Sequence, residues 1–543
     1  MARSADLPPT SAADAASLFR PMPPRTSPAA LRDVGDADRA RQCAGRPIRV
    51  GLIVGTFTFG GSETETIELV YGANPNRLVF SGIAVKLPRP LPDGEPPKDG
   101  SFPLIYTVAS DKIDASEPRV RLVATFEDAV QAVIGKSDII LTWGIPSLQE
   151  HLPEGALPPI VVVSKDSGDW AKRFLHSNSL LTRYCVANST VAASAFPTRV
   201  QGRVRIIHDG INLNRVVPRI SREAQRRLWD LEVGDKVAGY LGRIEADKGA
   251  AKTVDGVALL GSEWKVVFIG ANPNCRFVRE LERQCKAKIP GRYRLLDWCH
   301  DVGSALAAFD VFCHPSDHEG FSNSLAEAWL AGVPTIYTAG TGAIPDLGEM
   351  GVPVSARANG TEIANALRGA YRNELLAARA RAVIENNYLV THYVRRWTDY
   401  LAWVLRQPRT LRILVLCPDA FIDRAYSWIL SMCHSCHGAH LCGVLVVAEG
   451  PATVDPRLMS IERAYACPIW PINYQEEVDF AVKYARPDVI VAWGIATLTH
   501  VLTNVARVPV VGAFDLSRFD PISSGAVSSA WMRSLKSVVG DVY

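Results

Sequence analysis

The chain of 543 residues lacks a long apolar run and lacks a strong net charge. No uninterrupted apolar stretch approaches the ~20 residues that a membrane-spanning helix needs. Residues 1–33 contain no apolar core of the kind that a signal peptide carries. The formal net charge is +3, which gives no support to a nucleic-acid partner. We therefore expect a cytoplasmic protein that does not bind nucleic acid.

Cysteine is also sparse, with 11 residues in 543. A cytoplasmic chain keeps its cysteines reduced, so we expect no disulfide framework. One cluster stands out: Cys433-x-x-Cys436-His437 matches a c-type haem motif, and His440 and Cys442 add zinc-like ligands. Haem attachment needs export, for which no signal is present. Zinc normally needs a second, well-spaced ligand pair. We predict neither group, no metal and no other cofactor.

The chain divides into a tail and three units. Residues 1–46 are rich in Pro, Ser and Ala, which predicts disorder. Residues 47–200 alternate apolar strands such as PIRVGLIVGTF with helices, and residues 201–409 repeat this alternation before a closing amphipathic helix. Such alternation predicts two parallel sheets covered on both faces. Ligands of such sheets bind at the C-terminal ends of the strands, so we expect a cleft between the two.

A third unit, residues 411–543, repeats the first. DIILTWGIPSL, residues 138–148, recurs as DVIVAWGIATL, residues 488–498, with six of eleven positions identical at an offset of 350. LRILVLCPDAF likewise matches IRVGLIVGTF at an offset of 363. The fold class is therefore α/β, with twin Rossmann-like domains and a third, C-terminal Rossmann-like half-unit. We interpret the third unit as a truncated copy of the N-terminal domain.

The stretch HPSDHEGFSNSLAEAWLAGVP is the most informative for chemistry. Glu319 follows an apolar strand, and Glu327 lies on one of the first turns of the next helix. The exposed N–H groups of Gly320 to Ser324 at the positive end of that helix suit a diphosphate. Glu327 could then accept hydrogen bonds from a ribose diol. The alternative is structural, because Ser324-x-x-Glu327 is also a capping box.

The whole stretch strongly resembles the signature of retaining nucleotide-sugar glycosyltransferases of the GT-B fold, family four. The motif stands here as Pro315–Phe321, then Glu327, then Ala328–Pro334. The resemblance extends over about residues 47–405 and implies catalytic roles for Glu319, Arg243 and Lys248. It also implies that a nucleotide diphosphate sugar is the co-substrate, with donor contacts from Gly60, Gly61, Gly320, Phe321, Ser322, Asn323, Ser324 and Glu327.

The two cations have a chemical rationale. In GYLGRIEADKG, Arg243 and Lys248 would offset the charge that develops on the departing diphosphate. A solvated loop is the alternative for this pair, and an ordinary strand-to-helix turn is the alternative for Gly60 and Gly61. The only Asp-x-Asp motif, Asp36-Ala37-Asp38, lies in the tail, so no metal is implied on the diphosphate.

One departure concerns the acceptor side. Many family members have a His after the strand that reads IVVVSKDSGDW here, and this chain offers Ser164, Lys165, Asp166 and Asp169 instead. We name Asp166 as the acceptor-side catalytic candidate. Lys165 is a second candidate, and plain loop residues are an equal alternative for both.

The resemblance implies transfer of a sugar to an acceptor hydroxyl with retention of anomeric configuration. The acceptor is a saccharide, a lipid-linked molecule or another hydroxyl compound. A nucleotide-sugar epimerase or hydrolase, and a non-catalytic nucleotide-sugar-binding scaffold, are the alternatives. The helix near Tyr388 to Arg406 packs on the core or, alternatively, makes a peripheral contact with the inner membrane face.

Overall fold

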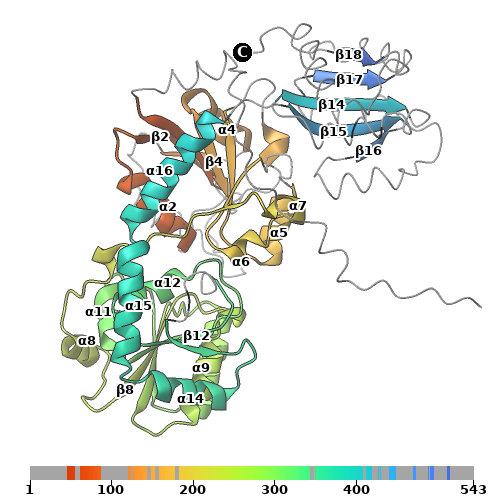
Figure 1. The fold of residues 1–543 in the computed structure, drawn as a ribbon. Coiled ribbons are helices and arrows are strands. Elements are labelled where there is room, and N and C mark those ends of the chain that lie inside the picture. Colours follow the sequence, from red (N-terminus) through yellow and green to blue (C-terminus); the bar gives the residue numbers. More distant parts are fainter. Residues whose placement is uncertain are drawn as a thin grey trace, which may run out of the picture.

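The structure, a computed structural model, describes most of residues 46–407 and the strands of a C-terminal unit (Figure 1). The described residues are 46–54, 61–86, 120–123, 126–143, 148–152, 158–177, 183–342, 348, 350–407, 411–418, 426, 429, 439–447, 469–472, 487, 489–493 and 510–513. The predictions for the tail, for Gly60 and for the Cys433–His437 motif fall outside these ranges.

The first domain contains a seven-stranded parallel sheet with strand order β3-β2-β1-β4-β5-β6-β7. Alternate residues of β1 enter different cores: Val50 and Leu52 join one face of the sheet, and Ile53 joins the other. The strands are β1 (Ile48–Val54), β2 (Leu78–Lys86), β3 (Val120–Val123), β4 (Ile139–Trp143), β5 (Ile160–Ser164), β6 (Tyr184–Ala187) and β7 (Arg205–Ile206). The helices are α2 (Gly61–Gly72), α4 (Phe126–Val133), η2 (Ile134–Lys136), η3 (Leu148–His151), α5 (Asp169–Ser177), α6 (Thr190–Ala193) and α7 (Thr198–Gln201).

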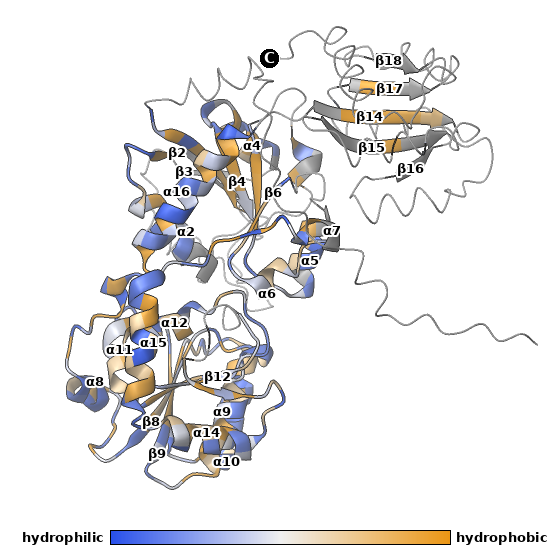
Figure 2. Ribbon diagram, in the orientation of Figure 1, coloured by the Kyte–Doolittle hydropathy of each residue, from blue (hydrophilic) through white to orange (hydrophobic). Residues whose placement is uncertain are grey.

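The second domain contains a six-stranded parallel sheet with strand order β10-β9-β8-β11-β12-β13. Its strands are β8 (Lys236–Leu241), β9 (Trp264–Ile269), β10 (Tyr293–Leu296), β11 (Val311–His314), β12 (Thr335–Thr338) and β13 (Val352–Val354). Its helices are η5 (Leu213–Arg215), α8 (Arg222–Leu228), η6 (Ala246–Lys248), α9 (Ala250–Ala258), α10 (Arg276–Lys288), α11 (Val302–Ala308), α12 (Asn323–Leu330), α14 (Gly360–Ala370) and α15 (Glu374–Asn387). Figure 2 shows hydrophobic strands in the first two sheets and helices that carry both hydrophilic and hydrophobic residues, as expected for helices that cover a sheet with one face.

The chain crosses between the two domains twice, and the crossings touch. Ile211 forms a parallel bridge with Leu389, and the N–H of Ile211 donates to the Tyr388 carbonyl at 2.8 Å. The chain then enters α16 (Val390–Arg406), which returns to the first domain (Figure 1). The two segments that connect the domains are therefore hydrogen-bonded to each other at the point where the chain passes between the domains.

Helix α16 buries its apolar face in the core of the first domain, where Tyr393, Trp397 and Leu401 join the residues of β1 and β4. This packing agrees with the core-packing interpretation of the stretch. Trp403, on the same helix, is half-exposed. None of the helices within the described ranges has the length and apolarity to cross a membrane. Strand β7 also extends the first sheet past residue 200.

A third sheet contains β14 (Leu411–Pro418), β15 (Ala439–Val447), β16 (Ile469–Ile472), β17 (Val489–Trp493) and β18 (Val510–Ala513). All its strands are parallel, in the order β16-β15-β14-β17-β18. Reading outward from the first strand of each unit, this is the order of β3-β2-β1-β4-β5 in the first sheet.

The register of the third sheet also matches that of the first. Val50 pairs with Ile139, and Ile413 (413 − 50 = 363) pairs with Val489 (489 − 139 = 350). Both first strands carry a register shift against their second strand, directly after Val50 in one sheet and after Ile413 in the other. Strand pairing therefore follows the two offsets that the sequence repeat displays.

Candidate functional site

The start of α12 has an unusual backbone. Ser322 is the N-cap residue, yet its side chain makes no capping hydrogen bond, and its φ of 79° lies in the left-handed region. A non-glycine residue held there costs of the order of 1–3 kcal/mol, and such residues cluster at ligand sites. The Ser322 hydroxyl instead lies 3.2 Å from Nε2 of His314, at the end of β11. The uncapped N–H groups of this turn are available to an anion.

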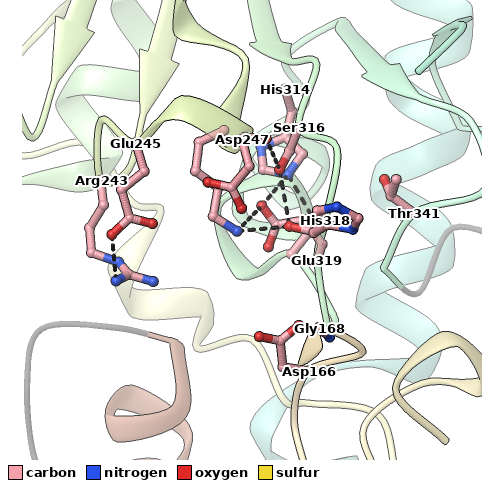
Figure 3. Close-up of polar contacts among 12 residues, drawn as sticks. Asp166, Gly168, Arg243, Glu245, Asp247, His314, Ser316, His318, Glu319 and Thr341 are labelled. Atoms are coloured by element: carbon pink, nitrogen blue, oxygen red, sulfur yellow. Dashed lines mark hydrogen bonds and ion pairs between the residues drawn. The ribbon is translucent and has the colours of Figure 1, made fainter. Parts of the chain in front are cut away.

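Glu319 is the centre of a charged cluster in the loop before α12 (Figure 3). Its Oε1 lies 3.1 Å from Lys248 Nζ and 3.3 Å from His314 Nε2. Burial by itself raises the pKa of the Glu319 carboxyl, but the hydrogen bond and charge of His314 and the charge of Lys248 outweigh burial and lower the pKa to about 2. Glu319 is therefore a carboxylate at neutral pH.

Lys248 lies where the loop after β8 packs closely against the loop after β11. The Gly249 backbone lies in the left-handed region, at φ 76°, and a Cβ there would come 2.0 Å from the Pro315 carbonyl oxygen. The N–H of Asp317 donates to the Asp247 carbonyl at 2.7 Å. Lys248 also donates to the His318 carbonyl at 2.8 Å. The Gly after Lys248 thus permits a close approach that places the ammonium beside Glu319.

Arg243 does not join this cluster. Its side chain is 62% exposed and pairs with Glu245, with Nη1 2.8 Å from Oε1. Figure 3 shows this pair apart from Glu319. The structure thus brings Lys248 and Glu319 together and leaves Arg243 on the surface of the same domain.

Glu327 lies in the second turn of α12, and its side chain is 7% exposed. Arg215 Nε donates to its Oε1 at 2.7 Å. The capping-box alternative does not form, because Ser322 and not Ser324 is the N-cap residue. Sequence reasoning missed Arg215, because an arginine in a crossing segment carries no motif.

The first domain touches the loop of Glu319 directly. Ser189 Oγ donates to the Gly320 carbonyl at 2.6 Å. A Cβ on Gly320 would come 1.7 Å from the carbonyl oxygen of Lys165, so only glycine permits this approach. Asp166 follows Lys165 and accepts hydrogen bonds from the N–H groups of Ser167 and Gly168 at 2.6 and 3.1 Å. Figure 3 shows Asp166 facing the Glu319 loop from the first domain.

Lys165 points into a buried polar cluster that sequence reasoning did not find. Its Nζ lies 2.5 Å from Glu65 Oε2, and the Asn323 amide donates to Glu65 Oε1 at 2.6 Å. Asn188 donates to Asp209 Oδ2 at 2.8 Å. Burial, and then the charge of Glu65, raise the pKa of Asp209 well above its usual range. Glu65, on α2, thus connects the first domain to the first residue of α12.

Two other residues that the resemblance predicts as donor contacts, Gly61 and Phe321, have no side chain that faces the proposed site. Gly61 is the first residue of α2. Phe321 is buried in the second domain's core, so only its backbone faces the turn. Within the part of the chain that the structure describes, no group of three or more His, Cys, Asp or Glu side chains is arranged to hold a metal ion.

Two facing Rossmann-like domains define the GT-B fold, and solved structures share it. The Anabaena protein Alr3699/HepE, solved in complex with UDP and glucose, matches with a TM-score of 0.54 at 17% identity, over 66% of this chain and 100% of that one. A glycosyltransferase from Rickettsia africae matches with a TM-score of 0.50 at 15% identity, over 66% and 98%.

Sequence comparison points to one family. Residues 235–373, which span the second sheet, match the model of the glycosyl transferases group 1 family. A GDP-mannose-dependent alpha-mannosyltransferase of Corynebacterium glutamicum is 28% identical over 131 residues, 23% of this chain and 29% of that protein. The lipopolysaccharide core biosynthesis mannosyltransferase LpsB of Rhizobium meliloti is 30% identical over 139 residues, 24% and 40%. The matches therefore span less than half the length of these curated relatives.

Proposed function

We propose that this chain transfers a sugar from a nucleotide diphosphate sugar to an acceptor hydroxyl, with retention of anomeric configuration and without a metal. The observation that carries the proposal is the placement of Lys248 beside Glu319, next to the uncapped start of α12. Lys248 and the N–H groups of α12 would bind the diphosphate, and Glu327 the ribose. Glu319 would face the sugar.

The proposed reaction needs no strong protein base. The bond between the anomeric carbon and the phosphate oxygen breaks, and a bond from the acceptor oxygen forms on the same face. The departing phosphate oxygen takes the acceptor proton. Lys248 stabilises the charge that grows on the diphosphate, a kind of electrostatic contribution typically worth 10²–10³-fold in rate. Asp166, which faces the Glu319 loop, is the proposed acceptor-side contact.

GDP-mannose is the first donor to test, because several of the matched relatives are named as GDP-mannose-dependent. UDP-glucose is the second, because the Anabaena structure contains UDP and glucose. The acceptor is a saccharide or a lipid-linked hydroxyl. A cytoplasmic location, at the inner membrane face for a lipid-linked acceptor, is part of the proposal.

The test is a transfer assay with each donor and a panel of hydroxyl acceptors, run on the wild type, Glu319→Ala and Lys248→Ala. The proposal expects a product with retained configuration, whose formation both substitutions strongly slow. Turnover of donor without acceptor, to an epimer or free sugar, would favour the epimerase or hydrolase. Donor binding without turnover across the panel would favour a non-catalytic scaffold.

We also propose that residues 411–543 are a second copy of the part of the first domain that contains β1 to β5, and that domains 47–200 and 201–409 hold the whole active site. The matching strand order and register support this copy. A chain ending after Gln407 should retain transfer, because the residues of the candidate site precede this point. Complete loss of transfer with the fold intact would contradict this division.

A further inference from the structure

Among the residues that the structure describes, Arg215 is the one side chain that contacts Glu327 through a hydrogen bond, and it comes from the segment that links the domains. Its Nε lies 2.7 Å from Glu327 Oε1, with the two side chains 24% and 7% exposed. Within the described part of the chain, Glu327 Oε2 has no hydrogen-bond donor. A carboxylate oxygen accepts more than one hydrogen bond, so the pair leaves Glu327 with free accepting capacity.

The segment that carries Arg215 is anchored on both sides. Asn212 is the N-cap residue of η5, and its side chain accepts from the N–H of Asn214 at 3.0 Å. The same side chain donates to both oxygens of Glu68 on α2, at 2.9 and 3.1 Å. Val216, directly after Arg215, is buried in the second domain's core. Arg215 is therefore presented to Glu327 from a fixed backbone.

From this geometry we propose that Arg215 is a positioning residue of the donor site, a role that depends on the proposed function of Glu327. Arg215 orients the Glu327 carboxylate so that its free lone pairs face the two ribose hydroxyls. Its planar guanidinium suits this task, because it remains charged and donates in a fixed direction. Since η5 is also tied to α2 through Asn212 and Glu68, ribose recognition is linked to the relative position of the two domains.

The proposal makes a prediction that a purely structural ion pair does not make. If Arg215 acts through the ribose, its loss weakens only ligands that carry the two ribose hydroxyls. The probes are GDP and UDP, each compared with its 2′,3′-dideoxy form, by isothermal titration on the full chain. We expect Arg215→Ala to weaken the ribonucleotides about 10-fold, as for one hydrogen bond to a charged group. The dideoxy forms should bind wild type and variant equally.

Two further variants complete the experiment. Arg219→Ala removes an exposed arginine four residues along the same segment and should change neither class of ligand. Arg215→Lys retains the charge and should keep the fold even if the alanine variant does not, with an intermediate preference for the ribose hydroxyls. Equal weakening of both ligand classes, or no weakening, in the folded Arg215 variants would overturn the proposal. Absence of nucleotide binding by the wild type would instead refute the proposed function, and this proposal with it.

Discussion

Lys165 Nζ lies 2.5 Å from Glu65 Oε2, and the same ammonium lies 4.6 Å from the centroid of the Trp143 ring. Both charged side chains are nearly buried, at 9% and 3% exposed. Lys165 was one of two candidates for an acceptor-side catalytic contact. The structure gives it a partner inside the first domain, so Asp166 remains the candidate that faces the Glu319 loop.

Removing one member of this buried pair should destabilise the protein strongly. Lys165→Met leaves the Glu65 carboxylate buried without its cation, which typically costs 3–5 kcal/mol of unfolding free energy. Denaturant unfolding of the full chain measures this loss. The double variant Lys165→Met/Glu65→Gln should recover much of it. Lys172→Met, which breaks an exposed pair with Asp169, is the matched control and should cost at most about 1 kcal/mol. If both lysine variants lose the same unfolding free energy, burial does not make the Lys165–Glu65 pair more important than an exposed pair.

Gly320→Ala should prevent the two domains from meeting. The new Cβ would come 1.7 Å from the Lys165 carbonyl oxygen, and a backbone atom cannot move aside as a flexible side chain can. We expect a larger radius of gyration by small-angle X-ray scattering and a loss of transfer. Gly202→Ala is the control, because nothing lies within 4 Å of its Cβ position. An unchanged radius of gyration with normal transfer would show that this contact is not needed.

Lys248→Met should lower kcat by about 10²–10³-fold, because Lys248 is placed to offset charge on the leaving diphosphate. Arg243→Met should have a smaller effect, since Arg243 is exposed and paired with Glu245. Steady-state kinetics with the accepted donor separates the two. Lys288→Met, in an exposed pair with Asp255, serves as the charge-matched control. A larger effect of Arg243 than of Lys248 would mean that the Arg243 loop rearranges on donor binding.

The Glu319 cluster should make stability fall in acid. The folded-state pKa of about 2 lies below the ordinary glutamate pKa of 4.5, so the stabilisation is present above about pH 4.5 and is lost as pH falls towards 2. Glu319→Gln should reduce the pH dependence of unfolding free energy in this window. Glu385→Gln is the control, because Glu385 forms an exposed pair with Arg381. If Glu319→Gln leaves the pH dependence of the unfolding free energy unchanged, the Glu319 cluster is not the source of that dependence.

Asp209 should act in the opposite direction. Its pKa is raised in the folded protein by burial and by Glu65, so its contribution to stability is complete below the unfolded pKa and declines as pH rises towards the folded pKa. Asp209→Asn replaces the carboxyl with a neutral amide of nearly the same shape, and so imitates the protonated form. The variant should gain stability over wild type as pH rises, by up to about 1.4 kcal/mol per pH unit. Urea unfolding between pH 5 and 9 tests this, and a constant difference would contradict it.

The local pattern of the sequence predicts much of the architecture. Apolar runs that alternate with helices predict β1, β4, β5, β8, β9 and β11, and the repeated phrase predicts that β17 matches β4. The strands β3 (VRLV), β13 (VPV) and β16 (IWPI) are less visible, because each is short and is interrupted by a charged residue or by Pro. The motif around Glu319 likewise predicts its position before a helix, since strand, loop and helix are contiguous in the chain.

Only the tertiary structure decided which charges meet. Arg215 and Glu327 are 112 residues apart, Lys165 and Glu65 are 100 apart, and Asn323 and Glu65 are 258 apart. No local pattern predicts such pairs, because they depend on how two sheets, their loops and α16 pack together. For the same reason the sequence predicted Arg243 and Lys248 as equals, whereas the packing of two loops around Gly249 places only Lys248 at Glu319.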